Sequence, residues 1–517
     1  MADPEATTPD AWWRNAVVYQ IYPRSFADGN GDGVGDLRGI IDQLDHIESL
    51  GVDAIWLSPI YPSPMRDFGY DVADYCDVDP VFGTLDDVDE LIADLHDRGL
   101  RLLLDWVPNH TSSDHPWFVE ARSSRQNAKR DWYVWRDPLP DGSPPTNWMA
   151  TFNGVPAWTF DEHTEQSWLH LFLPDQPDLN WANPDVESAM HDTLRFWLDR
   201  GVDGFRSDVV NLIGKGTDVD DLTPELASVA LLATDRPFGH ELLRRIRQLL
   251  DAYDHDPMMV GEVYLLRPGE SASYLGTDDE PELHLSFDFR SVHTDWEPER
   301  LHATISSIQS DFSSPRWPTW VLSNHDQPRH RTRYGSDEHA RAAAVMSLTM
   351  RGTPFLYAGE ELGLTDGDVP PERMVDPDGR DGCRAPIPWL TEGDHETEHG
   401  WGDHPWLPFP TNASTHALDA QLSNPESILS LYRRLLELRR STPALHRGSM
   451  ELAPLERDLL RWTRDDGADR WTIVVNAGTS PVEWPADLDA AHAALTSHSG
   501  GSIADTIRPL EAIVFHG

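Results

Sequence analysis

The sequence predicts an α/β protein: a (β/α)8 TIM barrel with an irregular domain inserted after its third strand and an antiparallel β domain at its C-terminal end. Two observations predict the barrel: short apolar runs recur up to residue 357, and patterns of helical period lie between them. A third predicts the last domain, because after residue 440 the pattern changes to short alternating runs and tight turns. The competing fold is a doubly wound open sheet, which usually carries a glycine-rich phosphate turn after its first strand.

The apolar runs are the expected strands of the barrel. They are Ala16–Tyr22, Val52–Leu57, Leu102–Trp106, Val202–Phe205, Met258–Val260, Leu283–Phe287, Thr319–Leu322 and Pro354–Tyr357. Helical patterns run from Leu37 to Ile47, from Val88 to Leu95 and from Val186 to Leu198. Each pattern is followed by a glycine, which is the expected end of a helix.

The longest gap between expected strands separates the third from the fourth. Residues 110–178 in this gap are rich in Trp, Pro, Asn and Gly and show no helical period, which indicates a small irregular domain on the third βα loop. We therefore predict barrel residues 1–109 and 179–440, an inserted domain over 110–178, and a C-terminal β domain over 441–517.

The charge of the chain limits its partners. The net charge of -47 argues against nucleic acid and anionic membranes, since both would be repelled, and favours a neutral substrate. Lys129 and Lys215 are the only lysines. An acidic surface with little lysine is typical of a protein kept soluble in concentrated salt. A moderately acidic enzyme from an arginine-rich proteome is the alternative.

The cysteines and the N-terminus indicate a soluble, cytoplasmic protein. Cys76 and Cys383 form no C-x-x-C or zinc pattern, so we expect free thiols. Met1–Ala6 has neither the basic start nor the apolar core of a targeting segment. No run approaches the roughly 18 uninterrupted apolar residues of a membrane helix.

Four segments place charged or imidazole side chains at the ends of expected strands. They are Asp105–His110, Gly204–Val209, Val260–Val263 and Ser323–Asp326. In a parallel barrel these strand ends meet on one face, where active sites lie. Three acids on separate strand ends, Asp208, Glu262 and Asp326, are what glycoside hydrolysis requires.

The neighbours of these acids suit the same chemistry. Arg206 and Asp208 lie two apart on a strand, so both point to one side, and a guanidinium favours an ionised carboxylate. A buried structural ion pair is the alternative for these two residues. Glu262 follows an apolar run that would desolvate it and favour its protonated form, as a general acid requires. His110 and His325 are neutral donors suited to sugar hydroxyls.

These segments resemble the four signature regions of the α-amylase superfamily of retaining glycoside hydrolases, glycoside hydrolase family 13, over nearly the whole chain. Gln176–Asn180 and Gly352–Gly363 look like the α-glucosidase and oligo-1,6-glucosidase branch of that family. The resemblance implies that Asp208 is the nucleophile, Glu262 the acid/base and Asp326 the stabiliser of the transition state.

The resemblance also implies which residues bind substrate. The glucose in the first subsite would be held by Asp67, Tyr70, His110, Arg206, His325 and Arg384, with Phe152 and Phe172 as aromatic contacts. Val209, directly after the nucleophile, would face the leaving group, where valine accompanies activity on α-1,6 links.

The segment from Asp28 to Asp36 has the spacing of a cation loop. As in a calcium loop, side-chain oxygens stand at positions 1, 3, 5 and 9, which are Asp28, Asn30, Asp32 and Asp36. The backbone carbonyl of Val34 stands at position 7. The glutamate of position 12 is missing, so the site would be structural. Together with the resemblance, the loop predicts one structural divalent cation, calcium in preference to magnesium, and nothing indicates an organic cofactor. A solvated acidic turn is the alternative.

The combined prediction is an exo-acting α-glucosidase that releases glucose, with retention, from the non-reducing end of short α-1,6- or α-1,4-linked oligosaccharides. One alternative is a transglycosylase or a sucrose or trehalose isomerase, in which a sugar hydroxyl replaces water. Another is a non-catalytic scaffold like the heavy subunits of amino-acid transporters, which lacks the catalytic acids that this chain keeps. The expected partner is a small oligosaccharide or disaccharide, and the oligomeric state is left open.

Overall fold

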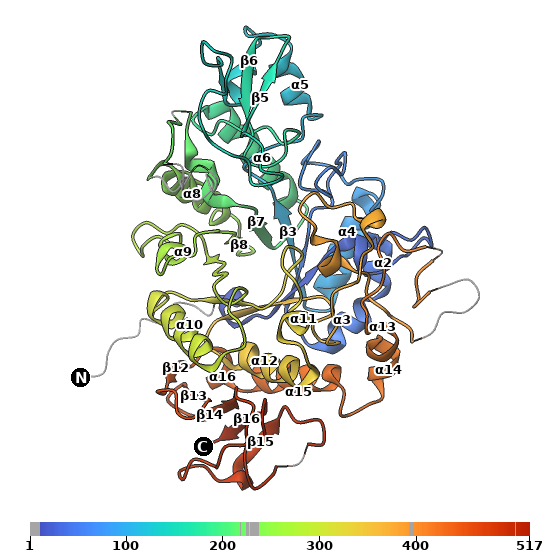
Figure 1. The fold of residues 1–517 in the computed structure, drawn as a ribbon, viewed down its shortest axis with the longest axis vertical. Coiled ribbons are helices and arrows are strands. Elements are labelled where there is room, and N and C mark those ends of the chain that lie inside the picture. Colours follow the sequence, from blue (N-terminus) through green and yellow to red (C-terminus); the bar gives the residue numbers. More distant parts are fainter. Residues whose placement is uncertain are drawn as a thin grey trace.

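The computed structural model of the chain describes residues 11–217, 219–223, 227, 237–391, 398–402, 404–501 and 503–517. Residues 1–10, which carry the expectation about targeting, lie outside this part. Figure 1 shows an elongated molecule, with the inserted segment at one end, the C-terminal sheet at the other and the barrel between them. Within the described ranges, no helix is both long enough and apolar enough to cross a membrane.

Eight parallel strands form the central sheet, in the order β10-β11-β1-β2-β3-β7-β8-β9. They are β1 (Val18–Ile21), β2 (Ala54–Leu57), β3 (Arg101–Trp106), β7 (Gly204–Ser207), β8 (Met258–Gly261), β9 (Leu285–Ser286), β10 (Thr319–Val321) and β11 (Thr353–Tyr357). All of them overlap the predicted runs, so the predicted barrel is confirmed. Between β9 and β10 the hydroxyl of Thr319 donates to the carbonyl of Ser286 (3.0 Å) and accepts from the N–H of Asp288 (3.3 Å).

Helices surround this sheet (Figure 1). The main ones are α2 (Leu37–Asp42), α3 (Leu44–Leu50), α4 (Leu85–Asp97), α6 (Pro184–Leu198), α8 (Pro237–Leu250), α10 (Pro298–Asp311), α12 (Asp337–Thr349) and α15 (Ile428–Ser441). The single helix expected from Leu37 to Ile47 is divided into α2 and α3, because the backbone of Gln43 leaves helical angles (φ -103°, ψ 10°). The apolar stripe still continues across the break, since Leu37 and Ile47 are both buried.

The inserted segment has a small sheet of its own. Its strands β4 (Trp135–Arg136), β5 (Trp158–Asp161) and β6 (Gln166–Leu169) pair in the order β4-β6-β5. His110 and Asp178 form an isolated antiparallel bridge. The two ends of the segment therefore lie side by side at the end of β3, which places the segment over one face of the barrel.

The C-terminal part is an antiparallel sheet, as predicted. Its order is β12-β13-β14-β16-β15, with β12 (Ser449–Leu452), β13 (Leu459–Asp465), β14 (Arg470–Asn476), β15 (Ala493–Thr496) and β16 (Ala512–His516).

Two buried arginines lie where this sheet meets the barrel, and both donate to the carbonyl of Leu445, just before β12. Of the two, Arg464 comes from the sheet and Arg439 from the barrel. Arg464 of β13 donates to the carbonyl of Thr349 at the end of α12 (2.7 Å), and Arg439 of α15 donates to the carbonyl of Gly352 (2.8 Å). Neither guanidinium forms an ion pair with a carboxylate of the described residues.

Candidate active site

The charged residues of the four predicted segments meet at the C-terminal ends of the barrel strands. Asp105 of β3 is in register with Arg206 of β7, which is in register with Val260 of β8. Asp208 and Glu262 follow the ends of β7 and β8 directly. Since the strands are parallel, these side chains reach the same edge of the barrel.

Arg206 binds three carboxylates at once. Its Nη1 lies 2.8 Å from Oδ1 of Asp105 and 2.7 Å from Oδ1 of Asp208, and its Nη2 lies 2.5 Å from Oε2 of Glu262. The arginine side chain is 2 % exposed. The interaction with Asp105 did not enter the predicted set of site residues, although Asp105 begins one of the four segments.

Burial disfavours the ionised forms of two carboxyls in this arrangement, Asp208 and Asp105. Burial raises the pKa of Asp208, and Arg206 opposes that shift while Glu262 and Asp105 add to it. Burial also raises the pKa of Asp105 to about 7, again against Arg206. One guanidinium faces three buried carboxylates, and this excess of negative charge raises the pKa of Asp208 and Asp105.

The hydrogen bonds of Glu262 indicate where a proton can reside. Its Oε2 accepts from Arg206 Nη2 (2.5 Å) and from the backbone N–H of Val209 (3.1 Å). An oxygen that accepts two N–H groups has little capacity for a proton of its own. Oε1 is therefore the oxygen that can carry it.

Val209 is positioned by this hydrogen bond. Its backbone has a left-handed conformation (φ 33°), and its side chain belongs to a buried apolar cluster with Leu212 and with residues of the inserted segment such as Leu171. Left-handed geometry in a β-branched residue is strained, and such strain gathers at active sites.

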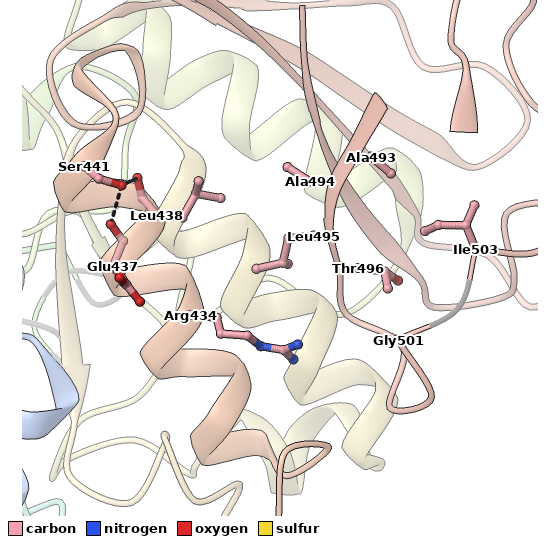
Figure 2. Close-up of a pocket in the computed structure, with 10 residues that line it drawn as sticks. All are labelled: Arg434, Glu437, Leu438, Ser441, Ala493, Ala494, Leu495, Thr496, Gly501 and Ile503. Atoms are coloured by element: carbon pink, nitrogen blue, oxygen red, sulfur yellow. Dashed lines mark hydrogen bonds between the residues drawn. The ribbon is translucent and has the colours of Figure 1, made fainter. Parts of the chain in front are cut away.

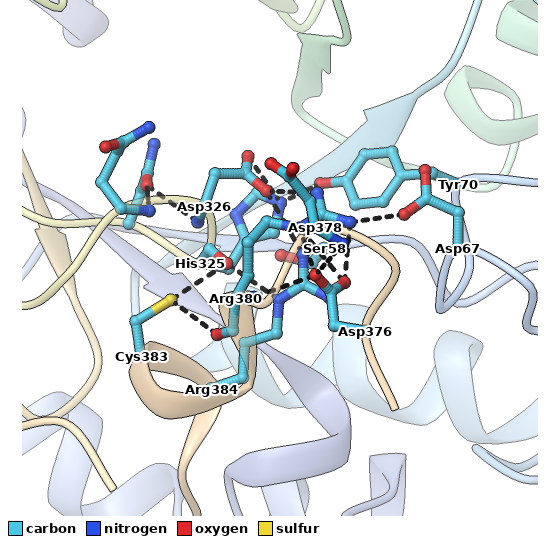
Figure 3. Close-up of polar contacts among 12 residues, drawn as sticks. Ser58, Asp67, Tyr70, His325, Asp326, Asp376, Asp378, Arg380, Cys383 and Arg384 are labelled. Carbon is cyan, nitrogen blue, oxygen red and sulfur yellow. Dashed lines mark hydrogen bonds and ion pairs between the residues drawn. The ribbon is translucent and has the colours of Figure 1, made fainter. Parts of the chain in front are cut away.

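Asp326 is the most accessible of the three acids, with 24 % of its side chain exposed, against 9 % for Asp208 and 10 % for Glu262. Figure 3 shows Asp326 beside two arginines, Arg380 (2.9 Å) and Arg384 (3.3 Å). Burial alone would raise the pKa of Asp326, but His325 and the two arginines hold it below its ordinary value. Asp326 is therefore ionised at neutral pH.

The structure distinguishes the two arginines of segment 380–384. Arg380 bridges Asp326 to Asp67, whose Oδ1 lies 2.6 Å from Nη2, and its guanidinium lies 5.1 Å from the centre of the Phe152 ring. The Arg384 side chain is 0 % exposed and is paired with Asp376 at 2.9 Å. Arg380, which sequence analysis did not select, is thus the one placed beside the predicted glucose contacts, and Arg384 lies beneath it.

His325 and Tyr70 form a hydrogen-bonded chain across the site. The amide nitrogen of Gln20 donates to His325 Nδ1 (2.7 Å), so Nε2 carries the proton and donates to the Tyr70 hydroxyl (2.6 Å). That hydroxyl donates to Asp105 Oδ2 (3.0 Å). Burial lowers the pKa of His325 to about 3, so this ring is neutral, as expected.

The inserted segment supplies another wall of the site. Phe172 lies 5.5 Å from Phe152 and 5.2 Å from His110, measured between ring centres. The Gln176 side chain donates to Asp67 Oδ2 (2.9 Å). Burial, followed by the charge of Lys215, lowers the pKa of His110 to about 3. The predicted residues from both parts of the chain are therefore brought together.

Lys215 is a second contact that sequence analysis did not identify. It is 1 % exposed, and its Nζ lies 2.6 Å from Oδ1 of Asn109 and 3.2 Å from Oδ2 of Asp178. This lysine joins the turn after β7 to the end of β3 and to the end of the inserted segment. A pairing between residues so far apart in sequence leaves no local pattern.

The carboxylates of the predicted cation loop accept backbone N–H groups, most of them from the loop itself. The Asp28 carboxylate accepts N–H bonds from Gly31, Asp32, Gly33 and Gly402. Asp36 caps α2 and accepts from Gly39. Across the described ranges, no group of three or more His, Cys, Asp or Glu side chains is arranged to hold a metal ion. The donors of the loop are nevertheless all oxygen, which is the set that calcium and magnesium take.

A separate hollow of about 390 Å³ lies between α15 and β15 (Figure 2). Its lining residues are Arg434, Glu437, Leu438, Ser441, Ala493, Ala494, Leu495, Thr496, Gly501 and Ile503. It contains one carboxylate and none of the predicted site residues, so the converging acids remain the candidate active site.

Comparison with known proteins agrees with this geometry. The family described as "Alpha amylase, catalytic domain" matches residues 20–448. A probable alpha-glucosidase of Rhizobium meliloti (strain 1021) is 42% identical over 90% of this chain and 89% of its own length. An oligo-1,6-glucosidase of Parageobacillus thermoglucosidasius is 39% identical over 90% of both chains. The crystal structure of the isomaltulose synthase from Protaminobacter rubrum superposes with a TM-score of 0.92 at 32% identity, over 98% of this chain and 100% of that one.

Proposed function

Since the chain belongs to the α-amylase family of glycoside hydrolases, we propose that it is a retaining, exo-acting α-glucosidase of short α-glucosides. The observation that carries the proposal is the contact of both Asp208 and Glu262 with one guanidinium, that of Arg206. Carboxyls held by one guanidinium lie close together, and a separation of about 5 to 5.5 Å is typical of retaining enzymes.

In the proposed reaction, Asp208 attacks the anomeric carbon and forms a covalent bond as the glycosidic bond breaks. Glu262 gives its proton to the leaving oxygen through Oε1, the oxygen that Arg206 and Val209 leave free. Glu262, now ionised, takes a proton from water, which attacks the same carbon and releases Asp208. Two displacements leave the configuration unchanged.

The contacts of Arg380 support exo action. Its ion pair with Asp67 and the hydrogen bond from Gln176 to Asp67 join the barrel side and the inserted side of the site. We propose that these polar groups bind the hydroxyls of a terminal glucose and prevent the chain from continuing beyond it. Arg384 acts behind them by orienting Asp326 and Asp376.

We propose α-1,6 links as the preferred substrate, on the basis of Val209 and of the named activity of the oligo-1,6-glucosidase relative. An isomerase or transglycosylase is the second candidate, favoured by the similarity to an isomaltulose synthase. The scaffold alternative is disfavoured because the three acids are present, and two of them, Asp208 and Glu262, share Arg206.

The test uses the wild-type protein and the Asp208→Asn variant. Wild type should release the α-anomer first from isomaltose or maltose, followed by NMR, and Asp208→Asn should lose turnover while its melting temperature is kept. First release of the β-anomer would refute retention. Incubation with sucrose separates the candidates, because an isomerase converts it to an isomeric disaccharide and a glucosidase gives glucose and fructose.

We further propose that Asp28, Asn30, Asp32, Asp36 and the Val34 carbonyl hold one structural divalent cation, calcium in preference to magnesium. The all-oxygen donor set supports this assignment. The bond from the Gly402 N–H to Asp28 links the loop to a distant segment, so a cation here would stabilise the fold and take no part in catalysis.

A further inference from the structure

Trp406 is an aromatic residue of the long segment after β11, and it contacts three segments that carry residues of the glucose site. It is half-buried and lies between Pro405 and Leu407. Its backbone N–H donates to the carbonyl of Gly33 (2.9 Å), and its indole Nε1 donates to the hydroxyl of Ser25 (3.1 Å). Two hydrogen bonds at opposite ends of the residue fix the plane of the indole.

The first contact of the indole is with Phe68, at 5.3 Å between ring centres. Phe68 has a left-handed backbone (φ 46°), which is strained in a residue with a Cβ. Asp67 and Tyr70 belong to the same turn, and both take part in the polar contacts of Figure 3. A strained turn keeps its shape only where its surroundings hold it, and the indole is part of those surroundings.

The second and third contacts reach residues that follow β1. The indole lies 6.3 Å from the Tyr22 ring, and Tyr22 is stacked on His325 at 5.8 Å. The Ser25 hydroxyl, which accepts from the indole, donates to the carbonyl of Arg384. Arg384 in turn pairs with Asp326 at 3.3 Å. One side chain is therefore linked, through three different neighbours, to three separate parts of the glucose site.

The two carboxyls of the proposed displacement are held from elsewhere. Asp208 and Glu262 pair with Arg206 of β7. The residues that the indole contacts follow β1 and β2 instead. A change at Trp406 should therefore disturb the binding of glucose while the catalytic carboxyls keep their arrangement.

We propose that Trp406 is a positioning residue, which holds Asp67, His325 and Asp326 in the arrangement that binds a terminal glucose. The inference rests on the proposed function, which assigns these three residues to glucose. Groups that bind one ligand from different segments must keep their positions to within about 0.5 Å, and they do so only where packing behind them is rigid. A large aromatic ring with a satisfied N–H provides such packing.

The experiment measures the Ki of glucose as a competitive inhibitor of p-nitrophenyl α-glucoside hydrolysis. Trp406→Leu removes the ring and its N–H, so the Ki should rise about tenfold. The pH profile of kcat/KM should keep its shape, because Asp208 and Glu262 keep Arg206. Trp406→Phe retains a ring and should raise the Ki about twofold. A merely structural role would lower the active fraction and leave the Ki unchanged.

Trp401→Leu is the matched control, because Trp401 lies in the same segment and is 0 % exposed. Its indole donates to the carbonyl of Ile387 (2.7 Å), and its ring lies 6.4 Å from that of Phe409. The control should lower the melting temperature and leave the Ki of its folded fraction unchanged.

An unchanged Ki in folded Trp406→Leu would overturn the inference, and so would an equal rise of the Ki in the control. If Trp406→Leu does not fold, Phe68→Leu takes its place, because it removes the first contact from the other side. The Ki should rise in that variant as well, and an unchanged value would overturn the inference. A wild type that does not hydrolyse the α-glucoside would refute the proposed function, on which the inference rests.

Discussion

At the residue scale, Arg206 is the contact on which the catalytic acids depend. It places one nitrogen on Asp105 and Asp208 and the other on Glu262, so it acts as a planar fork. A lysine carries a single compact charge and cannot span both positions.

Arg206→Lys should therefore reduce kcat/KM by at least about a hundredfold, because two interactions with charged groups weaken together. The matched variant is Arg439→Lys, which changes a buried arginine outside the site. Arg439→Lys should lower the melting temperature with little change in kcat for the folded fraction. Equal losses of kcat in the two variants would argue against a specific role for Arg206.

Lys215 allows a second comparison, because the chain contains one other lysine. Lys215→Met should destabilise the protein by about 3 to 5 kcal/mol, since it leaves Asp178 buried without its cation. Lys129 contacts Glu120 at the surface, at 3.5 Å, so Lys129→Met should cost at most about 1 kcal/mol. Urea unfolding of both variants measures the difference.

The acids of the site could be predicted because each stands at the end of an apolar run. The sequence could not show which of Arg380 and Arg384 lies beside the predicted glucose contacts. Both are arginines of one short segment, and only the fold distinguishes their positions. Lys215 and its partner Asp178 lie on different elements, and their pairing depends on how the inserted segment is folded back.

At the element scale, the strands could be predicted from the sequence because buried parallel strands are continuously apolar. The break between α2 and α3 could not be predicted, because the apolar stripe continues through it. The limits 110–178 of the inserted domain stay a prediction, although the bridge between His110 and Asp178 joins those two positions.

The turn after β11 contains a carboxyl that should make stability depend on pH. Glu360 is 2 % exposed, and burial raises its pKa to about 8 from an ordinary 4.5. The pKa of Glu360 is higher in the folded state than in the unfolded state. Its protonated carboxyl therefore contributes stability that is fully present below about pH 4.5 and is lost as pH rises through 8.

Glu360→Gln keeps the shape without the titration, so its melting temperature should fall less between pH 6 and pH 9 than that of wild type. The adjacent Glu361 accepts bonds from the Tyr19 hydroxyl and the Gly359 N–H. Glu361→Gln should therefore destabilise at both pH values. An identical pH profile for Glu360→Gln and wild type would contradict the assignment.

The loop after β1 gives a prediction about metal. Asp32→Ala should lower the melting temperature measured in calcium, and EDTA should lower that of wild type but not of the variant. Activity in the cold should change little, since the loop contributes no catalytic group. A wild type whose melting temperature is indifferent to both calcium and EDTA would rule out a structural cation.

At the scale of the whole molecule, the charge of -47 predicts a response to salt. Acidic side chains repel one another in dilute buffer, and salt screens this repulsion, over about 10 Å at 0.1 M and about 3 Å at 1 M. We propose that the protein is salt-adapted, and its melting temperature should rise from dilute buffer to molar sodium or potassium chloride. Sorbitol at matched osmolarity should produce a smaller rise. A melting temperature independent of salt would show that the acidic composition is not an adaptation to salt.

The contacts between the barrel and the C-terminal sheet should respond less to salt than the acidic surface does. Arg439 and Arg464 donate to main-chain carbonyls, and every amino acid supplies a carbonyl. A substitution at Thr349 that keeps the backbone path therefore leaves its carbonyl in place for Arg464. Gly352 has no such freedom, because its φ is 142° and a Cβ there would lie 2.7 Å from the Pro318 carbonyl oxygen. Over evolutionary time, the residue at position 349 can therefore change while Arg464, which bonds its carbonyl, stays fixed. In brine the same bonds persist, because they do not depend on attraction to a carboxylate.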